Sequence, residues 1–524
     1  MAFLSRLRTR QNAGKGSTPS VAHVIKKRQG KRKILGAFCA LTLLLILPLV
    51  ISQWNIYRAN LAVKNQNWPQ IPPMKKSDRL LIIAPHCDDE TLGAGGTIAA
   101  ARQSGASVRV IFLTNGDGSR ATRYVVQARE WKAKINSAPT PRTSANLFQR
   151  IAAMRQEEAI AACAKLGVAK KEVFFLGFPD GGLRAMWETN WENNNSFVSP
   201  TTNSSRSPYA NSFTPNAAYS GAHVTRDLEK IFREYKPTVI LTTHPEDTHG
   251  DHWAAFAYSS ATLEKLRLSD EESTRRDASR SRLMGFLVHR GIWPTPNGYH
   301  PQKNLWPPAS LVKSDTKWQI ATLSPGAQKS KKSALESYSS QLATTPRYLR
   351  AFVRGNELFG GLSKSQKVID PPSDSAWSEA WRAADIQNMQ FQTTPKTLTI
   401  KTVLTGAPSS RVCYRYALHL ISSKQISVWK IEARQRGTSV QATSEKLSQN
   451  QQSNNRISNP NVLKANLTAD GLSFELPRQM LELQNKSATI LISAATFAGA
   501  KRLDQTATTA FSSAAFSDES FGLK

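Results

Sequence analysis

The sequence predicts an α/β protein: a Rossmann-like, mostly parallel sheet with helices on both faces, followed by a C-terminal all-β, sandwich-like domain and preceded by an N-terminal transmembrane helix. Three observations support this prediction. Short apolar runs alternate with helical stretches in the middle of the chain, strand-like runs without helices follow them, and an uncharged apolar segment stands near the N-terminus. A length of 524 residues also exceeds what one hydrophobic core usually fills.

The N-terminal segment carries an unusual charge pattern. Residues 1–77 hold 14 Lys or Arg and no Asp or Glu, and residues 34–51 form an uncharged apolar run of 18 residues. Such a run is close to the length of helix that crosses a bilayer. The excess of basic residues before it predicts that the N-terminus stays in the cytoplasm.

We therefore expect a single-pass membrane protein with an extracytoplasmic catalytic domain. Its parts would be a basic cytoplasmic segment at 1–33, an anchor in contact with membrane lipid at 34–54 and a linker at 55–77. Two alternatives stay open, a cleaved secretory signal and a buried helix of a soluble domain. A cleaved signal usually has a shorter apolar region and small residues at its cleavage site, whereas this segment ends in VISQW.

The α/β domain is predicted at residues 78–385. Short apolar runs typical of strands buried in a parallel sheet lie at 80–84, 108–113, 173–176 and 239–241. Helices are predicted at 91–103 and 151–166, and a third helix has one apolar face made of Leu228, Ile231, Phe232 and Tyr235. Ligands of such sheets bind at the carboxyl ends of the strands, so residues directly after a strand matter most.

The rest of the chain is predicted from its turn residues and its β-rich runs. Two stretches without periodicity, 131–149 and 188–222, are expected to be loops. A sandwich-like domain is predicted at 393–524, because several Val-, Ile-, Thr- and aromatic-rich runs are separated by polar breaks. Its strands are expected at 397–404, 411–421, 426–432, 472–476 and 488–495. Residue chemistry does not indicate what this domain does.

The first unusual motif follows the first predicted strand directly. Residues 85–90 read PHCDDE, which places one imidazole and three carboxylates in a single turn. Like charges this close repel one another unless a cation neutralises them, and a divalent metal does so well. The alternative is a helix-capping turn in which Asp88 or Asp89 caps the helix that follows.

The second motif follows the strand predicted at 239–241. Residues 244–252 read HPEDTHGDH, three histidines and three acids in nine residues. Imidazole and carboxylate together suit zinc, and catalytic zinc sites use three protein ligands and a water. A solvated loop is the alternative for this motif alone. Because the four cysteines lie far apart, nitrogen and oxygen would have to hold any metal. Both motifs at one edge of a sheet predict a metal site.

Together the two motifs resemble those of the PIG-L family of zinc-dependent de-N-acetylases, also called LmbE-like. The family's motifs have the forms (A/P)-H-x-D-D-E and H-P-D-H, and the resemblance covers roughly residues 79–359. Other stretches agree with it: TNGD at 114–117, the Arg155 and Glu158 pair, and FLGFPDGGL at 175–183. The departures are mild, since Cys87 and Gly250 stand where the family often has Pro.

The resemblance implies a role for each matching residue. His86, Asp89 and His252 would be the ligands of one Zn²⁺ ion per site, and Asp88 would be the general base. His249 would help to stabilise the oxyanion, Asp251 would orient a histidine, and Arg155 and Asp180 would bind substrate. For Arg155 a salt bridge on a helix surface is the alternative, and for Asp251 a solvated turn. His244 is either structural or catalytic.

These residues predict a membrane-anchored, zinc-dependent hydrolase that removes the N-acetyl group from an N-acetylglucosamine-type amino sugar or glycoconjugate. The alternative is a non-catalytic, envelope glycan-binding protein with a structural metal site, since 17 of the 31 excess positive charges lie after the anchor. No nucleic-acid partner is expected, because only charge favours one. No nucleotide cofactor is expected either, because the GAGG run at 93–96 lacks the G-x-G-x-x-G spacing.

Overall fold

The computed structural model divides the chain into two compact units, Met1–Asn65 and Gln66–Lys524. All elements discussed below belong to the second unit. The structure describes residues 58, 63–64, 66–119, 122–127, 144–312, 314, 316–362, 367–370, 382–394, 396–448, 461–481 and 488–512.

The membrane prediction needs correction. Within the described ranges, no helix is both long and apolar enough to cross a bilayer. The longest of these helices, α4 (Ser144–Lys165) and α7 (Gly250–Arg267), carry several charged side chains along their length, which explains the finding. The segment 34–54, on which the expected transmembrane helix, lipid contact and localisation depended, lies outside the described residues.

The predicted α/β sheet with helices is confirmed, and it is a mixed sheet of seven strands in the order β3-β2-β1-β4-β5-β7-β6. Its strands are β1 (Arg79–Ala84), β2 (Ser107–Thr114), β3 (Val173–Phe178), β4 (Val239–Thr243), β5 (Arg282–Phe286), β6 (Thr316–Thr322) and β7 (Asn356–Leu362). Strands β1 to β5 pair in parallel, whereas β7 pairs antiparallel with both β5 and β6. Sequence reasoning found β1 to β4 and missed the other three.

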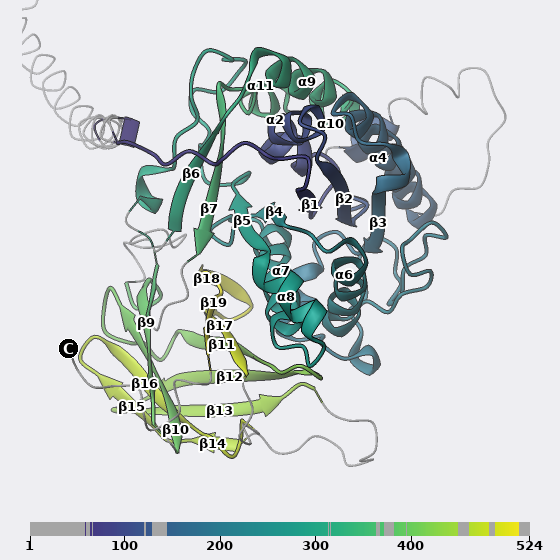
Figure 1. Cartoon of the computed structure of the whole chain (residues 1–524). Helices are drawn as coiled ribbons and strands as arrows, with labels where there is room; N and C mark the ends of the chain where they lie inside the picture. Colours follow the sequence, from purple (N-terminus) through teal and green to yellow (C-terminus); the bar gives the residue numbers. More distant parts are fainter. Residues whose placement is uncertain are drawn as a thin grey trace, which may run out of the picture. The chain divides into compact units, whose positions relative to one another are not determined.

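Two hydrophobic cores lie on opposite faces of this sheet. Along β1, Leu80 and Ile82 belong to one core, and Leu81 and Ile83 belong to the other, as the two-residue period of a strand requires. The first core includes residues of α2 (Asp89–Gln103), α4 and α9 (Pro325–Leu335), and the second includes residues of α5 (Leu183–Glu188), α6 (Gly221–Tyr235) and α7 (Figure 1). Both faces of the sheet are therefore covered by helices.

Helix α2 begins close to where the sequence predicted it, but α4 begins within the stretch 131–149 that was predicted to be a loop, and residues 131–143 lie outside the described residues. The helix expected at 91–103 is α2, which begins at Asp89, and the one expected at 151–166 is α4, which begins at Ser144. The third predicted helix, with its apolar face of Leu228, Ile231, Phe232 and Tyr235, lies within α6. Further helices among the described residues are α8 (Glu272–Arg280), α10 (Ser339–Leu342) and α11 (Pro346–Arg350). Residues 189–220, in the second predicted loop, contain one short 3-10 turn and an isolated bridge between Arg206 and Ala218.

The C-terminal part consists of two β-sheets that share one hydrophobic core. One sheet contains β8 (Lys367–Ile369), β9 (Ile386–Thr393), β10 (Thr397–Leu404), β15 (Ala465–Thr468) and β16 (Gly471–Pro477). The other contains β11 (Cys413–Ile421), β12 (Ile426–Arg436), β13 (Ser439–Lys446), β14 (Asn461–Leu463), β17 (Thr489–Ala498), β18 (Lys501–Gln505) and β19 (Thr509–Ser512). The predicted all-β fold is confirmed, and the predicted domain bounds stay predictions.

The β-sheets pack directly on α5 and on α7, the helix that begins within the second motif. The ring of His419 on β11 stacks on Trp187 of α5 with centroids 3.7 Å apart. The indole N–H of Trp253 on α7 donates a hydrogen bond to the carbonyl of Thr506 at 3.0 Å, and Arg502 pairs with Glu188 at 2.5 Å. The second core therefore extends into the β part.

Candidate metal centre and active site

The register of the sheet brings the two motifs together. Strands β1 and β4 are neighbours, with Ile83 opposite Thr242, so their carboxyl ends lie side by side. The first motif occupies the turn between β1 and α2, and the second leads from β4 into α7. This is the edge of a parallel sheet at which ligands bind.

The atoms of the three predicted ligands converge. The Nδ1 atom of His86 lies 3.2 Å from Oδ2 of Asp89 and 3.2 Å from Nε2 of His252, and the same carboxylate oxygen lies 3.2 Å from that Nε2 atom. All three residues are buried. Because two imidazole nitrogens and a carboxylate oxygen meet at almost equal distances, this His-His-Asp group can hold a divalent cation.

Other acids and histidines surround this group. Among the described residues, donor atoms also lie within 4.8 Å of one another in the sets His86, His249, His252 and His86, Asp180, Asp251. The first motif does not act as a capping turn, because the Asp88 side chain makes no capping hydrogen bond to α2 and Oδ2 of Asp89 accepts from the N–H of His86 at 2.9 Å. The Asp88 backbone has a φ of 146°, a conformation that costs a residue with a side chain about 1–3 kcal/mol. Such strain is often found at functional sites.

Arg155 and Asp88 form a buried pair beside the metal-binding group. Arg155 is 4% exposed, which excludes the alternative of a salt bridge on a helix surface. Its Nη2 atom lies 3.4 Å from Oδ1 of Asp88 and donates to the carbonyl of Cys87 at 2.7 Å, and its Nη1 atom donates to the carbonyl of Gly116 at 3.0 Å. Burial raises the pKa of Asp88 to about 7, while the charge of Arg155 acts in the opposite direction.

Asp251 contacts the far side of the His86 ring. Its Oδ2 atom lies 3.2 Å from Nε2 of His86, and its carboxylate also accepts hydrogen bonds from the N–H groups of Gly181 at 2.6 Å and Leu183 at 3.0 Å. Asp180 lies on the same side, with Oδ1 3.3 Å from Nε2 of His86. A proton on Nε2 would leave the Nδ1 lone pair of His86 directed at Asp89 and His252.

Asp247 is a site residue that sequence reasoning missed. It is fully buried, and its Oδ2 atom lies 3.0 Å from Nδ1 of His252. Its carboxylate accepts three backbone hydrogen bonds, from Val288 at 2.9 Å, His289 at 2.8 Å and His249 at 2.9 Å. Burial opposes its ionisation, yet His252 lowers its pKa to about 2. An ionised Asp247 holds the proton of His252 on Nδ1, so that Nε2 is free to bind a cation.

His249 lies at the start of α7 and faces the same group. Its Nδ1 atom accepts a hydrogen bond from the N–H of Asp251 at 3.2 Å, which leaves its proton on Nε2. Its ring centroid lies 4.8 Å from that of His86 and 4.9 Å from that of His252. Burial lowers the pKa of His249 to about 4, and the neighbouring His86 and His252 contribute. His249 is therefore neutral and can donate a hydrogen bond.

His289 is a second residue that sequence reasoning missed. Its ring lies 4.8 Å from that of His252 and 5.6 Å from that of His249. It follows β5 closely, as the two motifs follow β1 and β4, so recognising β5 would have drawn attention to it. His244 is structural: its ring stacks on Trp318, its Nδ1 atom accepts from the N–H of Glu246 at 3.1 Å, and burial lowers its pKa to about 3.

Comparisons with known proteins agree with this geometry. The family described as "PIG-L: GlcNAc-PI de-N-acetylase" matches residues 81–262. A 1D-myo-inositol 2-acetamido-2-deoxy-alpha-D-glucopyranoside deacetylase of Rhodococcus opacus (strain B4) is 28% identical over 191 residues, which cover 36% of this chain and 53% of that protein. A second deacetylase of this description, deacetylase 1 of Saccharopolyspora erythraea, is 29% identical over 196 residues. The match covers 36% of this chain and 54% of that protein.

These matches are partial. The chain spans about half the length of the curated relatives it matches. Among solved structures, the N,N'-diacetylchitobiose deacetylase from Pyrococcus horikoshii is 16% identical, and the likeness covers 57% of this chain and 87% of that one. Its TM-score of 0.31 is too low to support an inference about function.

Proposed function

Because residues 81–262 form a PIG-L family domain, we propose that this chain is a zinc-dependent hydrolase that removes the N-acetyl group from an N-acetylglucosamine-type amino sugar or glycoconjugate. The observation that carries the proposal is the convergence of His86, Asp89 and His252 beside Asp88. The curated relatives, named as deacetylases of a 2-acetamido sugar linked to inositol, support the same chemistry.

The three converging atoms fit a zinc ion. In a tetrahedral zinc site with bonds of about 2.0–2.1 Å, neighbouring ligand atoms lie about 3.4 Å apart. The corresponding distances here are all 3.2 Å. His86, Asp89 and His252 would therefore hold the ion on one side and leave a position for solvent. When bound, zinc would supply a Lewis acid that polarises the acetamide carbonyl and lowers the pKa of water.

Asp88 is proposed as the general base. Hydrolysis of the amide requires a group that accepts a proton from the attacking water and then gives a proton to the departing amine nitrogen. A carboxylate with a pKa near 7 can do both at neutral pH. Arg155 would hold Asp88 in position through their ion pair.

The developing oxyanion and the sugar would be bound by other side chains. The neutral His249 can donate its Nε2–H to the oxyanion, which such donors stabilise best when they are positioned in advance. Asp180 is proposed to accept hydrogen bonds from sugar hydroxyls. Arg155, the other proposed substrate-binding residue, already contacts Asp88, Cys87 and Gly116, so we expect it to act mainly through Asp88. Asp251 is proposed to orient His86.

The test is acetate release by the purified full chain, with zinc, from an N-acetylglucosaminyl-inositol and from N-acetylglucosamine oligosaccharides. We expect Asp88→Asn to lower the rate by about a hundredfold to ten-thousandfold, the usual contribution of a general base, while zinc stays bound. Asp470→Asn is the matched control, because Asp470 is an exposed carboxylate of the β part. No acetate from any of these substrates, together with intact zinc and glycan binding, would favour the non-catalytic alternative.

A further inference from the structure

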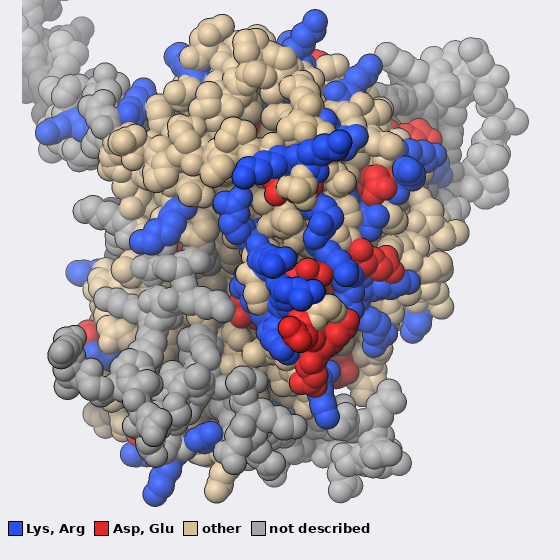
Figure 2. Space-filling model, in the orientation of Figure 1, with Lys and Arg blue, Asp and Glu red and all other residues tan. Residues whose placement is uncertain are grey.

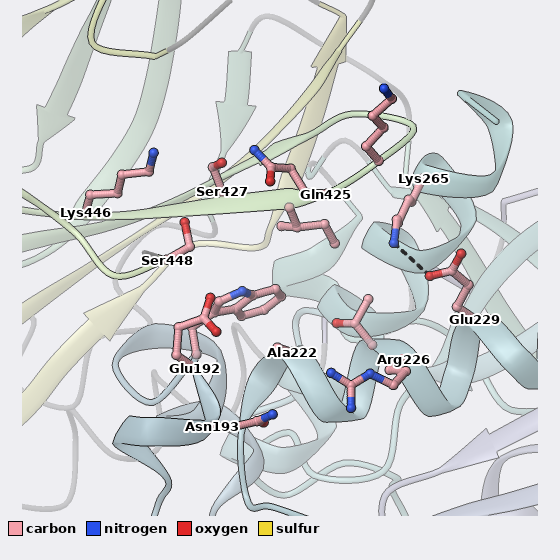
Figure 3. A pocket seen from close by; sticks show the side chains of 14 residues that line it. Glu192, Asn193, Ala222, Arg226, Glu229, Lys265, Gln425, Ser427, Lys446 and Ser448 are labelled. Atoms are coloured by element: carbon pink, nitrogen blue, oxygen red, sulfur yellow. Dashed lines mark hydrogen bonds and ion pairs between the residues drawn. The ribbon is translucent and has the colours of Figure 1, made fainter. Parts of the chain in front are cut away.

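A large cavity lies between α6 and α7 on one side and the β12–β13 hairpin on the other (Figure 3). Its volume is about 700 Å³, within the range of about 300–1,000 Å³ that is typical of ligand sites. None of the residues proposed above to act in hydrolysis lines it. We propose that this cavity binds an anionic oligosaccharide, a short stretch of glycan that carries carboxylate or phosphate groups.

The charges that line the cavity are mainly positive. Four cations, Arg226, Lys265, Lys424 and Lys446, line it, against two carboxylates. One of these carboxylates, Glu229, is already paired with Lys265 at 2.8 Å. Figure 2 shows Lys and Arg side chains gathered, with some acidic ones among them, over the region where Figure 1 places α7 and α8. An anion would therefore enter a region of favourable potential.

Arg226 and Lys424 are two of these cations that remain available to a ligand. Both are exposed, and neither forms a hydrogen bond or an ion pair with another described side chain. They belong to different parts of the fold, since Arg226 lies on α6 and Lys424 lies in the turn between β11 and β12. The second acid, Glu192, is half-buried, and burial raises its pKa while Arg226 acts in the opposite direction. A ligand that spans the cavity can contact both cations.

The polar groups of the lining suit sugar hydroxyls. Asn193, Gln425 and Ser427 present amide and hydroxyl groups, which both donate and accept hydrogen bonds (Figure 3). Trp191 is the aromatic residue of the lining, but it is only 3% exposed, and its ring packs against Trp187 and His419. Single-stranded nucleic acid needs exposed rings on which its bases can stack. The lining therefore favours an anionic glycan over a nucleic acid.

Binding would be measured by calorimetry with the full chain. The probes are tetragalacturonate as a carboxylate glycan, a phosphorylated maltotetraose as a phosphate glycan, chitotetraose as a neutral glycan, and single-stranded DNA. We expect one saturable site for at least one of the anionic glycans, with an affinity that falls as salt is added. The tighter binder of the two anionic glycans shows whether the cavity prefers carboxylate or phosphate groups. The double variant Arg226→Gln/Lys424→Gln should weaken binding by about tenfold, a loss of about 1.4 kcal/mol.

The control variant is Arg411→Gln/Lys396→Gln, which removes the same charge from two exposed residues that do not line the cavity. It should change the affinity less than about twofold. Equal weakening by both double variants would overturn the proposal, because it would indicate an effect of net charge alone. Absence of binding, equal binding of chitotetraose, or tighter binding of DNA would overturn it too. Acetate release is measured in parallel on the same variants. Because the cavity contains none of the residues proposed for hydrolysis, failure of glycan binding at the cavity and failure of the proposed hydrolysis can be told apart.

Discussion

Replacing Lys331 by Met tests the ion pair that Lys331 forms with Glu357 inside the α/β domain. The ammonium of Lys331 lies 2.6 Å from Oε1 of Glu357 and donates to the carbonyl of Leu92 at 2.8 Å. The carboxylate of Glu357 also accepts hydrogen bonds from the N–H groups of Gly96 at 2.7 Å and Thr97 at 2.8 Å. Leu92, Gly96 and Thr97 all belong to α2. Both partners of the ion pair therefore form hydrogen bonds with the backbone of α2, the helix that begins at the proposed ligand Asp89.

The expected loss of stability is large, because both residues are only 1% exposed. Removing one partner leaves the Glu357 carboxylate buried without its counterion and leaves the Leu92 carbonyl without this donor. Breaking a buried ion pair in this way costs about 3–5 kcal/mol of unfolding free energy. Burial lowers the pKa of Lys331, and the neighbouring carboxylate of Glu357 acts in the opposite direction.

The control is the next residue along the chain. Lys332 has a side chain that is 45% exposed and lies 3.7 Å from Glu336, so Lys332→Met should cost less than about 1 kcal/mol. Urea unfolding of the full chain, followed by tryptophan fluorescence, measures both variants. The double variant Lys331→Met/Glu357→Leu should recover part of the loss, since it leaves no buried charge unpaired. Equal urea midpoints for Lys331→Met and Lys332→Met would refute the reasoning.

Two further predictions concern buried carboxylates. Asp247→Asn should weaken zinc binding by about tenfold to a hundredfold, because an amide no longer holds the proton of His252 on Nδ1. Competition with a chelator measures the zinc affinity, and an unchanged affinity would exclude this role of Asp247. Burial raises the pKa of Asp227 to about 6, so the folded state prefers the protonated acid. The free energy of unfolding therefore increases as the pH falls from about 6 to about 4, and above about pH 6 the ionised Asp227 lowers it by up to about 3 kcal/mol. Asp227→Asn should therefore raise the urea midpoint at neutral pH and flatten its pH dependence, and a lower midpoint at neutral pH would contradict this.

Strands rich in apolar and β-branched residues were predictable from the sequence. The run at 80–84 corresponds to β1, and the run at 397–404 coincides with β10. Strands β5 and β7 were missed because glycines interrupt them. A Cβ atom on Gly285 would lie 2.7 Å from the Cα atom of His244, and one on Gly360 would lie 2.7 Å from its Nε2 atom. These glycines make room for a buried histidine, a reason that exists only in the folded chain.

The amino-acid sequence alone was enough to predict the chemistry that we propose for the site. Two motifs rich in histidine and acid, each directly after a buried strand, predict a metal site at one edge of a parallel sheet. Only the tertiary structure decided which acid contacts which histidine: Asp247 contacts His252, five residues away, whereas Asp251 contacts His86, 165 residues away. Spacing in the second motif is compatible with either pairing. The choice follows from how α7 packs beside the turn after β1, and from the backbone N–H groups of Val288 and Gly181 that hold each carboxylate in place.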